Sequence, residues 1–177
     1  MILRDEFPSL ADWRIEIVGT DLSPTIIERA KEAVYTTFEV QRGLPIQLLL
    51  KHFEQIDDRW RIKDELRRRV SFRIGNLLED LRALGTFDVV FCRNVLIYFD
   101  RDTKARVLAA IGARLAADGA LILGGAESVF GITTLFAEIH GLRGVYAHVD
   151  AETNFAVSSN RSLHILRPAA TGVSKVA

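Results

Sequence analysis

The stretch FDVVFCRN at residues 87–94 decides the fold class of this chain. Its first six residues are almost continuously apolar, and a polar pair, Arg93-Asn94, follows them directly. A short apolar run without alternation is typical of a strand buried on both faces, as in a parallel sheet covered by helices. Polar residues that end a central strand of such a sheet lie at the edge where ligands bind. The stretch therefore predicts an α/β fold and marks its ligand side.

Strand-like and helix-like segments alternate on both sides of this stretch. Further strands are expected at Ile15–Val18, Trp60–Ile62, Val70–Ile74, Ala120–Leu123 and Gly144–His148. Helices are expected from Pro24 to Val34, around Leu48–Phe53, and over Asp102–Leu115 and Leu135–Ile139, with a turn at Asp118-Gly119. Such alternation predicts a doubly wound, mainly parallel sheet with helices on both faces.

Length and composition narrow the class of protein. The 177 residues fit one domain, and the 23 basic residues balance the 23 acidic ones, so the formal net charge is zero. Neutrality argues against a general nucleic-acid-binding protein. A single cysteine, Cys92, excludes an intrachain disulfide, and no apolar run approaches the ~20 residues of a membrane span. We expect a soluble, cytoplasmic protein.

Two polar residues follow predicted strands before the central stretch. Asp21 comes just after one strand and just before Ser23-Pro24, a pair suited to begin a helix. Its carboxylate either accepts both hydroxyls of a ribose or serves as a turn or cap residue. Asn76 follows another strand, and its amide either pairs with a base edge or tolerates a left-handed loop conformation. Position alone leaves both alternatives open.

The segment after residue 92 and the glycines after residue 123 are the other candidates for chemistry. Arg93, Asn94 and Tyr98 lie at the predicted ligand edge, although an isolated tyrosine is more often core filler. Glu127-Ser128 follows Gly124-Gly125, where no lysine completes a phosphate-binding loop. The four histidines show no metal-ligand spacing with one another or with Cys92, so no metal site is predicted.

Taken together, these segments resemble the CheR-type methyltransferases, which methylate glutamates on chemoreceptors. Residues 17–23 (IVGTDLS) resemble the acidic ribose-binding segment of that family, and residues 76–78 (NLL) resemble its adenine-side segment. Residues 87–99 (FDVVFCRNVLIYF) are close to the family's most specific signature. The likeness spans roughly Ile15 to Tyr146.

The resemblance implies a Rossmann-like class I methyltransferase fold that uses S-adenosylmethionine and releases S-adenosylhomocysteine. It implies that Tyr98 and Arg93 lie at the methyl-transfer site, and that the cofactor is bound by Asp21, Asn76, Leu77 and Asn94. Near pH 7 the acceptor glutamate is ionised, because its reference pKa is about 4.3. Catalysis then needs positioning and exclusion of water rather than a strong general base.

The sequence departs from the family at its start. Residues 1–8 resemble the end of the family's first helix, so the first strand, the glycine-rich loop and the helical N-terminal domain are not seen. We expect an incomplete cofactor-binding domain over residues 1–149, a small β-subdomain inserted at about 54–66, and a poorly ordered tail over 150–177. From the missing loop we expect weak cofactor binding or none, and weak or no activity. From the bared strand edge we expect self-association or poor solubility.

The implied partners are the cytoplasmic helices of chemoreceptors. The link between Phe53 and Trp60 is short, with Asp57-Asp58 as its turn, so we expect no dependence on the receptor's C-terminal pentapeptide. The basic cluster at 67–69 either attracts acidic receptor helices or forms a solvated helix face. Three alternatives stay open: a methyltransferase acting on another substrate, a non-catalytic regulatory module, and, more weakly, a dehydrogenase that binds NAD through Asp21.

Overall fold

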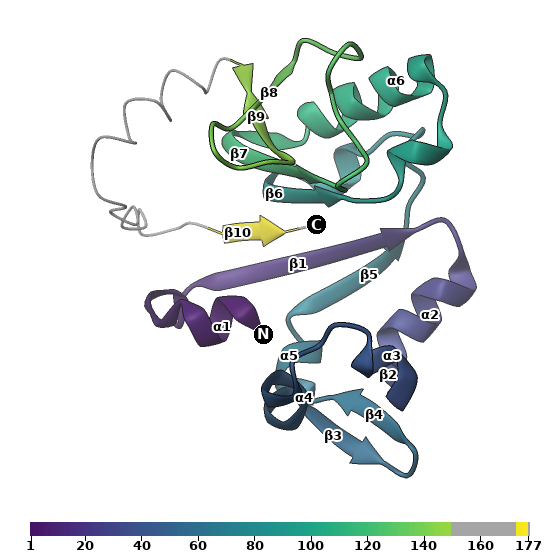
Figure 1. The fold of residues 1–177 in the computed structure, drawn as a ribbon, viewed down its shortest axis with the longest axis vertical. Helices are drawn as coiled ribbons and strands as arrows, with labels where there is room; N and C mark the ends of the chain where they lie inside the picture. The colour runs from purple at the N-terminus through teal and green to yellow at the C-terminus, as the bar shows by residue number, and fades with distance from the viewer. Residues whose placement is uncertain (150–172, 177) are drawn as a thin grey trace. The chain divides into compact units, whose positions relative to one another are not determined.

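A computed structural model describes residues 1–149 and 173–176 of the chain. The chain divides into two compact units, Met1–Gly75 and Asn76–Ala177, whose positions relative to one another are not determined (Figure 1). None of the helices in the described residues is long and apolar enough to cross a bilayer.

The first unit contains a parallel strand pair. Strand β1 (Arg14–Asp21) pairs with β5 (Val70–Ile74), and the register sets Asp21 opposite Ile74 at the end of both strands. Helix α2 (Pro24–Glu32) follows β1; its N-cap Ser23 accepts a hydrogen bond from the Ile26 N–H. Ala33 caps the C-terminus of α2 in a left-handed conformation, with a φ of 54°, and the helix cannot continue past it. The helix packs against β5, and β1, α2 and β5 therefore form a crossover unit.

A small antiparallel sheet completes the first unit. Its strand order is β2 (Val34–Thr36), β4 (Arg59–Ile62), β3 (Phe53–Ile56), as Figure 1 shows. Helices α3 (Thr37–Gln41) and α4 (Ile46–His52) join β2 to β3, and Val40, Leu49 and Phe53 form the buried core beneath them. The N-terminal turns are α1 (Ile2–Glu6) and η1 (Pro8–Leu10). The predicted β-subdomain is thus present, but it begins at Val34 rather than near residue 54.

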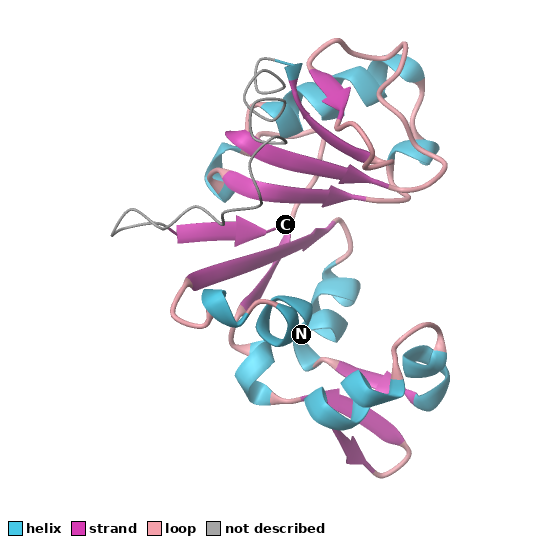
Figure 2. Ribbon diagram, turned by 60° about the vertical axis from the view of Figure 1, so that its left-hand side comes forward, coloured by secondary structure: helices cyan, strands magenta, loops and turns pink. Residues whose placement is uncertain are grey.

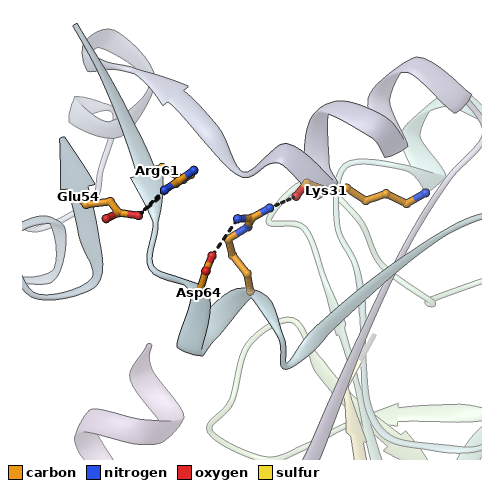
Figure 3. Close-up of polar contacts among 5 residues, drawn as sticks. Lys31, Glu54, Arg61 and Asp64 are labelled. Carbon is orange, nitrogen blue, oxygen red and sulfur yellow. Dashed lines mark hydrogen bonds and ion pairs between the residues drawn. The ribbon is translucent and has the colours of Figure 1, made fainter. Parts of the chain in front are cut away.

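Polar contacts link β4 to β3 within this sheet and join the short helix α5 (Asp64–Arg67) to α2. Arg61 on β4 donates to Glu54 on β3, with an Nη2–Oε1 distance of 3.0 Å (Figure 3). Arg67 donates to Asp64 Oδ1 at 2.9 Å and to the Lys31 carbonyl at 3.0 Å, close to the end of α2. The guanidinium of Arg67 is therefore engaged within its own unit, which favours a structural role over receptor attraction for this arginine.

The second unit is built around β6 (Phe87–Cys92) and the helix that follows it. The strand order is β10-β6-β7-β9-β8, with bounds Val173–Val176 for β10, Leu115–Leu123 for β7, Val145–His148 for β9 and Phe136–Glu138 for β8. The pairs β10–β6 and β6–β7 are parallel, whereas β7–β9 and β9–β8 are antiparallel. Helix α6 (Arg101–Gly112) connects β6 to β7. It buries Val107, Leu108 and Ile111. Figure 2 distinguishes the helices from the strands of the chain by colour.

The structure confirms the α/β fold class and most predicted elements. β5 and β6 have the predicted bounds, and the β3–β4 hairpin turns at Asp57-Asp58 as expected. The predicted helix over 135–139 is wrong, because Phe136–Glu138 pairs with β9 as a strand. The predicted turn at Asp118-Gly119 is also wrong: these residues lie within β7, where the register with β6 shifts.

Three predicted helices end earlier than expected, and part of the predicted tail lies outside the described residues. Val34 begins β2 instead of ending α2, Phe53 begins β3, and Leu115 begins β7 instead of ending α6. Residues 150–172 and 177 are not described, so the short strand considered at 163–166 stays untested. Within the tail, Val173–Val176 forms β10 beside β6, whereas an unpaired edge was expected.

Candidate functional site

The segment Arg93–Tyr98 leaves the carboxyl end of β6 as a tight turn. Asn94 takes a left-handed φ of 60°, which asparagine tolerates better than most residues, and a 3-10 turn, η3 (Leu96–Tyr98), follows. Leu96 is 1% exposed and anchors the turn in the core, whereas Tyr98 is 79% exposed. Tyr98 is therefore not core filler, and its ring is available to a ligand.

A carboxylate that sequence reasoning left without a role holds this turn. Glu127, in the loop after β7, is only 8% exposed. Its Oε1 accepts the N–H groups of Val95 (2.9 Å), Leu96 (2.7 Å) and Ile97 (3.3 Å). Its Oε2 accepts the N–H groups of Asn94 (2.7 Å) and Gly124 (2.8 Å). The sequence shows only that Glu127 follows Gly124, the glycine after β7, by three residues, and this spacing does not indicate which backbone groups the carboxylate binds.

The hydrogen bonds keep Glu127 charged in spite of its burial. Desolvation opposes ionisation, but the N–H donors of Asn94, Gly124, Val95 and Leu96 outweigh it and lower the pKa of the carboxyl. The neighbouring Cys92 behaves in the opposite way. Burial, helped by the negative charge of Glu127, raises the pKa of its thiol to about 11. Cys92 is therefore protonated at neutral pH and is not a nucleophile there.

Asp21 lies in the first unit, at the end of β1. Its Oδ1 accepts the N–H of Ser23 at 2.8 Å, as in an Asx turn. Among the described residues, Oδ2 accepts no hydrogen bond and remains available to a hydroxyl group. One oxygen therefore shapes the turn, as one of the two alternatives held, and the ribose-binding role of Asp21 stays a prediction.

Asn76 opens the second unit, and its side chain is partly engaged. Its Oδ1 accepts the Leu78 N–H at 3.0 Å, and its Nδ2 donates to Glu79 Oε1 at 3.1 Å. One further N–H of the amide remains for another partner. Leu77 beside it is half-buried. The local bonds fit the loop role considered from the sequence, and the adenine-side role of Asn76 and Leu77 stays a prediction.

An open hollow of about 1300 Å³ adjoins the Arg93 end of the turn. One wall is formed by Arg93 and the loop from Gly124 to Ser128, and the other by residues 138–144. A second hollow, of about 690 Å³, lies in the first unit between α2 and α5 and contains none of the predicted site residues. In the described residues no group of histidine, cysteine, aspartate and glutamate side chains could hold a metal ion.

The structure brings five of the six predicted site residues into one unit. Arg93, Asn94 and Tyr98 share a single turn, and Asn76 with Leu77 belongs to the same unit. Asp21 belongs to the other unit. Convergence of Asp21 with the turn on one cofactor therefore stays a prediction.

Comparison with known proteins places these features in a family. Residues 1–145 match the model of the CheR methyltransferase SAM-binding domain. "Chemotaxis protein methyltransferase 1" of Vibrio cholerae is 38% identical over 132 residues, which cover 74% of this chain and 48% of the relative. "Chemotaxis protein methyltransferase Cher2" of Pseudomonas putida is 42% identical over 118 residues, 66% of this chain and 43% of the relative.

A third relative carries a different name. The "Probable biofilm formation methyltransferase WspC" of Pseudomonas aeruginosa is 37% identical over 121 residues, covering 67% of this chain and 28% of the relative. The chain thus spans about half the length, or less, of these curated relatives. Among solved structures, "A Pericyclic Reaction enzyme" aligns with a TM-score of 0.39 at 12% identity, covering 71% of this chain and 24% of that one, too weak a likeness to support any argument.

Proposed function

The chain belongs to the CheR methyltransferase family through its SAM-binding domain, and we propose that it serves methyl transfer from S-adenosylmethionine to glutamate carboxylates of chemoreceptors. The observation that carries the proposal is the Arg93–Tyr98 turn. It lies at the carboxyl end of a buried parallel strand, where ligands of α/β sheets bind, and it presents an exposed tyrosine. The names of the chemotaxis relatives support chemoreceptors as the substrate class.

The chain's residues fit S-adenosylmethionine. Oδ2 of Asp21, which accepts no hydrogen bond from the described residues, is the kind of acceptor that a ribose hydroxyl needs, and its place at the end of β1 is where such groups lie in nucleotide-binding folds. Asn76 would offer its remaining N–H to the adenine edge, with Leu77 supplying apolar surface. Asn94 would face the cofactor from the turn.

The cofactor supplies a methyl group activated by a positively charged sulfonium. A glutamate oxygen of the acceptor would form the new C–O bond as the C–S bond breaks, with carboxylate and sulfonium charges cancelling and no proton released. The chain's task is then to align the acceptor and exclude water. Arg93 would hold the acceptor carboxylate through its guanidinium, and Tyr98 would orient the reacting groups from its exposed place on η3.

The proposed partners are the cytoplasmic helices of the receptors rather than a C-terminal pentapeptide. The β3–β4 hairpin turns within two residues, Asp57 and Asp58, and only its strand β3 lies at an edge of the small sheet, because β4 pairs with both β2 and β3. The hollow beside Arg93 in the second unit is large enough for a side chain of the acceptor segment. Binding of the receptor's terminal peptide to the chain would contradict this part of the proposal.

A methyl-transfer assay tests the proposed function. The chain is mixed with cofactor labelled in its methyl group and with receptor-containing membranes, and labelled methanol released by alkali is measured, because methyl esters are alkali-labile. We expect wild-type chain to label receptors weakly, and Tyr98→Phe or Asp21→Ala to lower this low kcat/KM at least tenfold further. Asp12→Ala, in an exposed turn of the first unit, is the matched control and should change it less than twofold.

The same assay separates the alternatives. Alkali-stable label, or label only on a small molecule, would indicate a methyltransferase with another substrate. Cofactor binding without any transfer would indicate a non-catalytic module. Either result would overturn the proposed reaction.

A further inference from the structure

Among the described residues of the second unit, the side chain of Glu127 accepts five hydrogen bonds, all from backbone N–H groups. Four consecutive N–H groups, from Asn94 to Ile97, point at one carboxylate, and the Gly124 N–H joins them. Consecutive backbone N–H groups that converge in this way form an anion-binding concavity. Here the anion is a side chain of the same unit, contributed by a loop some thirty residues further along the chain.

We propose that Glu127 is the positioning residue of the Arg93–Tyr98 turn: its carboxylate accepts the N–H groups of the turn and so fixes the conformation of the turn's backbone. The part of this proposal that concerns methyl transfer rests on the proposed function; the part that concerns the turn does not. Glu127 is 8% exposed and its two oxygens already accept five hydrogen bonds, so it acts through the turn and not on a bound molecule.

The geometry explains why an ionised carboxylate is needed. Without the carboxylate, the four N–H groups of the turn would point at one place that holds no acceptor. Buried N–H groups without a hydrogen-bond partner are costly. Asn94 also holds a left-handed φ of 60°, a conformation that the surrounding bonds must maintain. The lowered pKa of Glu127 agrees with a charged group at this position. Removing the charge should therefore release the residues that carry Arg93, Asn94 and Tyr98.

Hydrogen exchange of backbone amides tests the turn directly in the full 177-residue chain. In the wild type, the amides of residues 94–97 should be protected. In Glu127→Gln, whose neutral amide brings its own N–H groups to the donors, exchange at these residues should rise at least tenfold. Glu138→Gln is the matched control, because Glu138 accepts a single backbone N–H, from Gly144, and is not bonded to the turn. It should leave residues 94–97 protected.

Chemical rescue distinguishes a positioning role from general loss of stability. Glu127→Ala empties the concavity but keeps its donors, so added formate should restore protection at residues 94–97, whereas chloride at equal ionic strength should not. Glu127→Asp, with the charge retained on a shorter side chain, should fall between wild type and Glu127→Gln. Unprotected amides at 94–97 in the wild type would overturn the proposal even if every variant failed to fold.

Kinetics link the turn to the proposed reaction. In the methyl-transfer assay, Glu127→Gln should lower kcat/KM for the cofactor at least tenfold at temperatures where the variant is folded, and formate should restore activity to Glu127→Ala. If wild-type chain transfers no methyl group, the proposed function fails, while the exchange and formate results still decide the role of Glu127. Unchanged exchange and unchanged kinetics in Glu127→Gln would overturn the inference itself.

Discussion

Among single residues, Gly124 shows most sharply how packing around the candidate site limits the sequence. A Cβ atom at this position would lie 2.6 Å from Glu127 Oε2, 2.7 Å from Asn94 Oδ1 and 3.0 Å from the Asn94 nitrogen. The carboxylate that would be displaced is the one that holds the turn. Glycine is therefore required here for close approach, and not for an unusual φ.

Replacing Gly124 by alanine should consequently be destabilising. We expect Gly124→Ala to lower the free energy of unfolding by about 1–3 kcal/mol, the usual range for overpacking, as measured by urea denaturation. Gly125→Ala is the matched control, because a Cβ atom at the next residue meets nothing within 4 Å. That control should stay within about 0.5 kcal/mol of wild type. Equal stability of the two variants would show that the loop after β7 shifts to accommodate a Cβ atom at residue 124 at little cost in free energy.

Between elements, a carboxylate joins the first helix to the small β-subdomain. Asp5 on α1 contacts His52 Nε2 at 2.6 Å and Lys51 Nζ at 2.8 Å, both on α4, and His52 is 1% exposed. The hydrogen bond from Lys51, followed by that from His52, lowers the pKa of Asp5 from 3.8 to about 2. The ionised form of Asp5 is thus the one that the folded unit favours.

The stability of the first unit should therefore depend on pH through Asp5. Because the folded-state pKa is the lower one, its contribution is complete above about pH 4 and is lost as the pH falls toward about 2. Asp5→Asn should remove most of this fall, so its melting temperature should change less than that of wild type between pH 5 and pH 2.5. Thermal unfolding followed by tryptophan fluorescence at each pH measures this melting temperature. Asp12→Asn, exposed in a turn, should keep the wild-type slope.

Sequence patterns predicted strands with polar ends better than they predicted where helices stop. β5 and β6 were bounded correctly because an apolar run gives way to polar or glycine residues at Gly75 and Arg93. The end of α6 was set too late because Leu115 continues the helical spacing after Gly112, although pairing with Phe87 draws it into β7.

Long-range contacts determine the secondary structure where the local sequence pattern gave the wrong prediction. Leu135, Phe136 and Ile139 have helical spacing, but Phe136 stacks on His148 at 5.2 Å and pairs with it across β8 and β9. For the site, the family likeness located the Arg93–Tyr98 segment. The role of Glu127 was not predictable, because it depends on a side chain reaching the backbone of a segment some thirty residues away.

At the scale of the whole molecule, the two units differ in their content of tryptophan, the residue that serves as a fluorescence probe of unfolding. Both tryptophans, Trp13 and Trp60, belong to Met1–Gly75, so tryptophan fluorescence reports only on the first unit. Far-UV circular dichroism reports on helices and strands of both. Segments that form separate contact clusters often unfold as separate cooperative units. We therefore expect the fluorescence and circular dichroism transitions of the wild-type chain not to coincide in urea.

Core truncations placed in each unit test this expectation. Leu108→Ala in α6, at a site with 0% exposure, should destabilise the second unit by about 2–5 kcal/mol, shifting the circular dichroism transition while fluorescence changes little. Leu49→Ala in α4, 5% exposed, should do the reverse and move the fluorescence transition most. If each variant instead shifted both transitions equally, the chain would unfold as one cooperative body, and the contact clusters would have no thermodynamic counterpart.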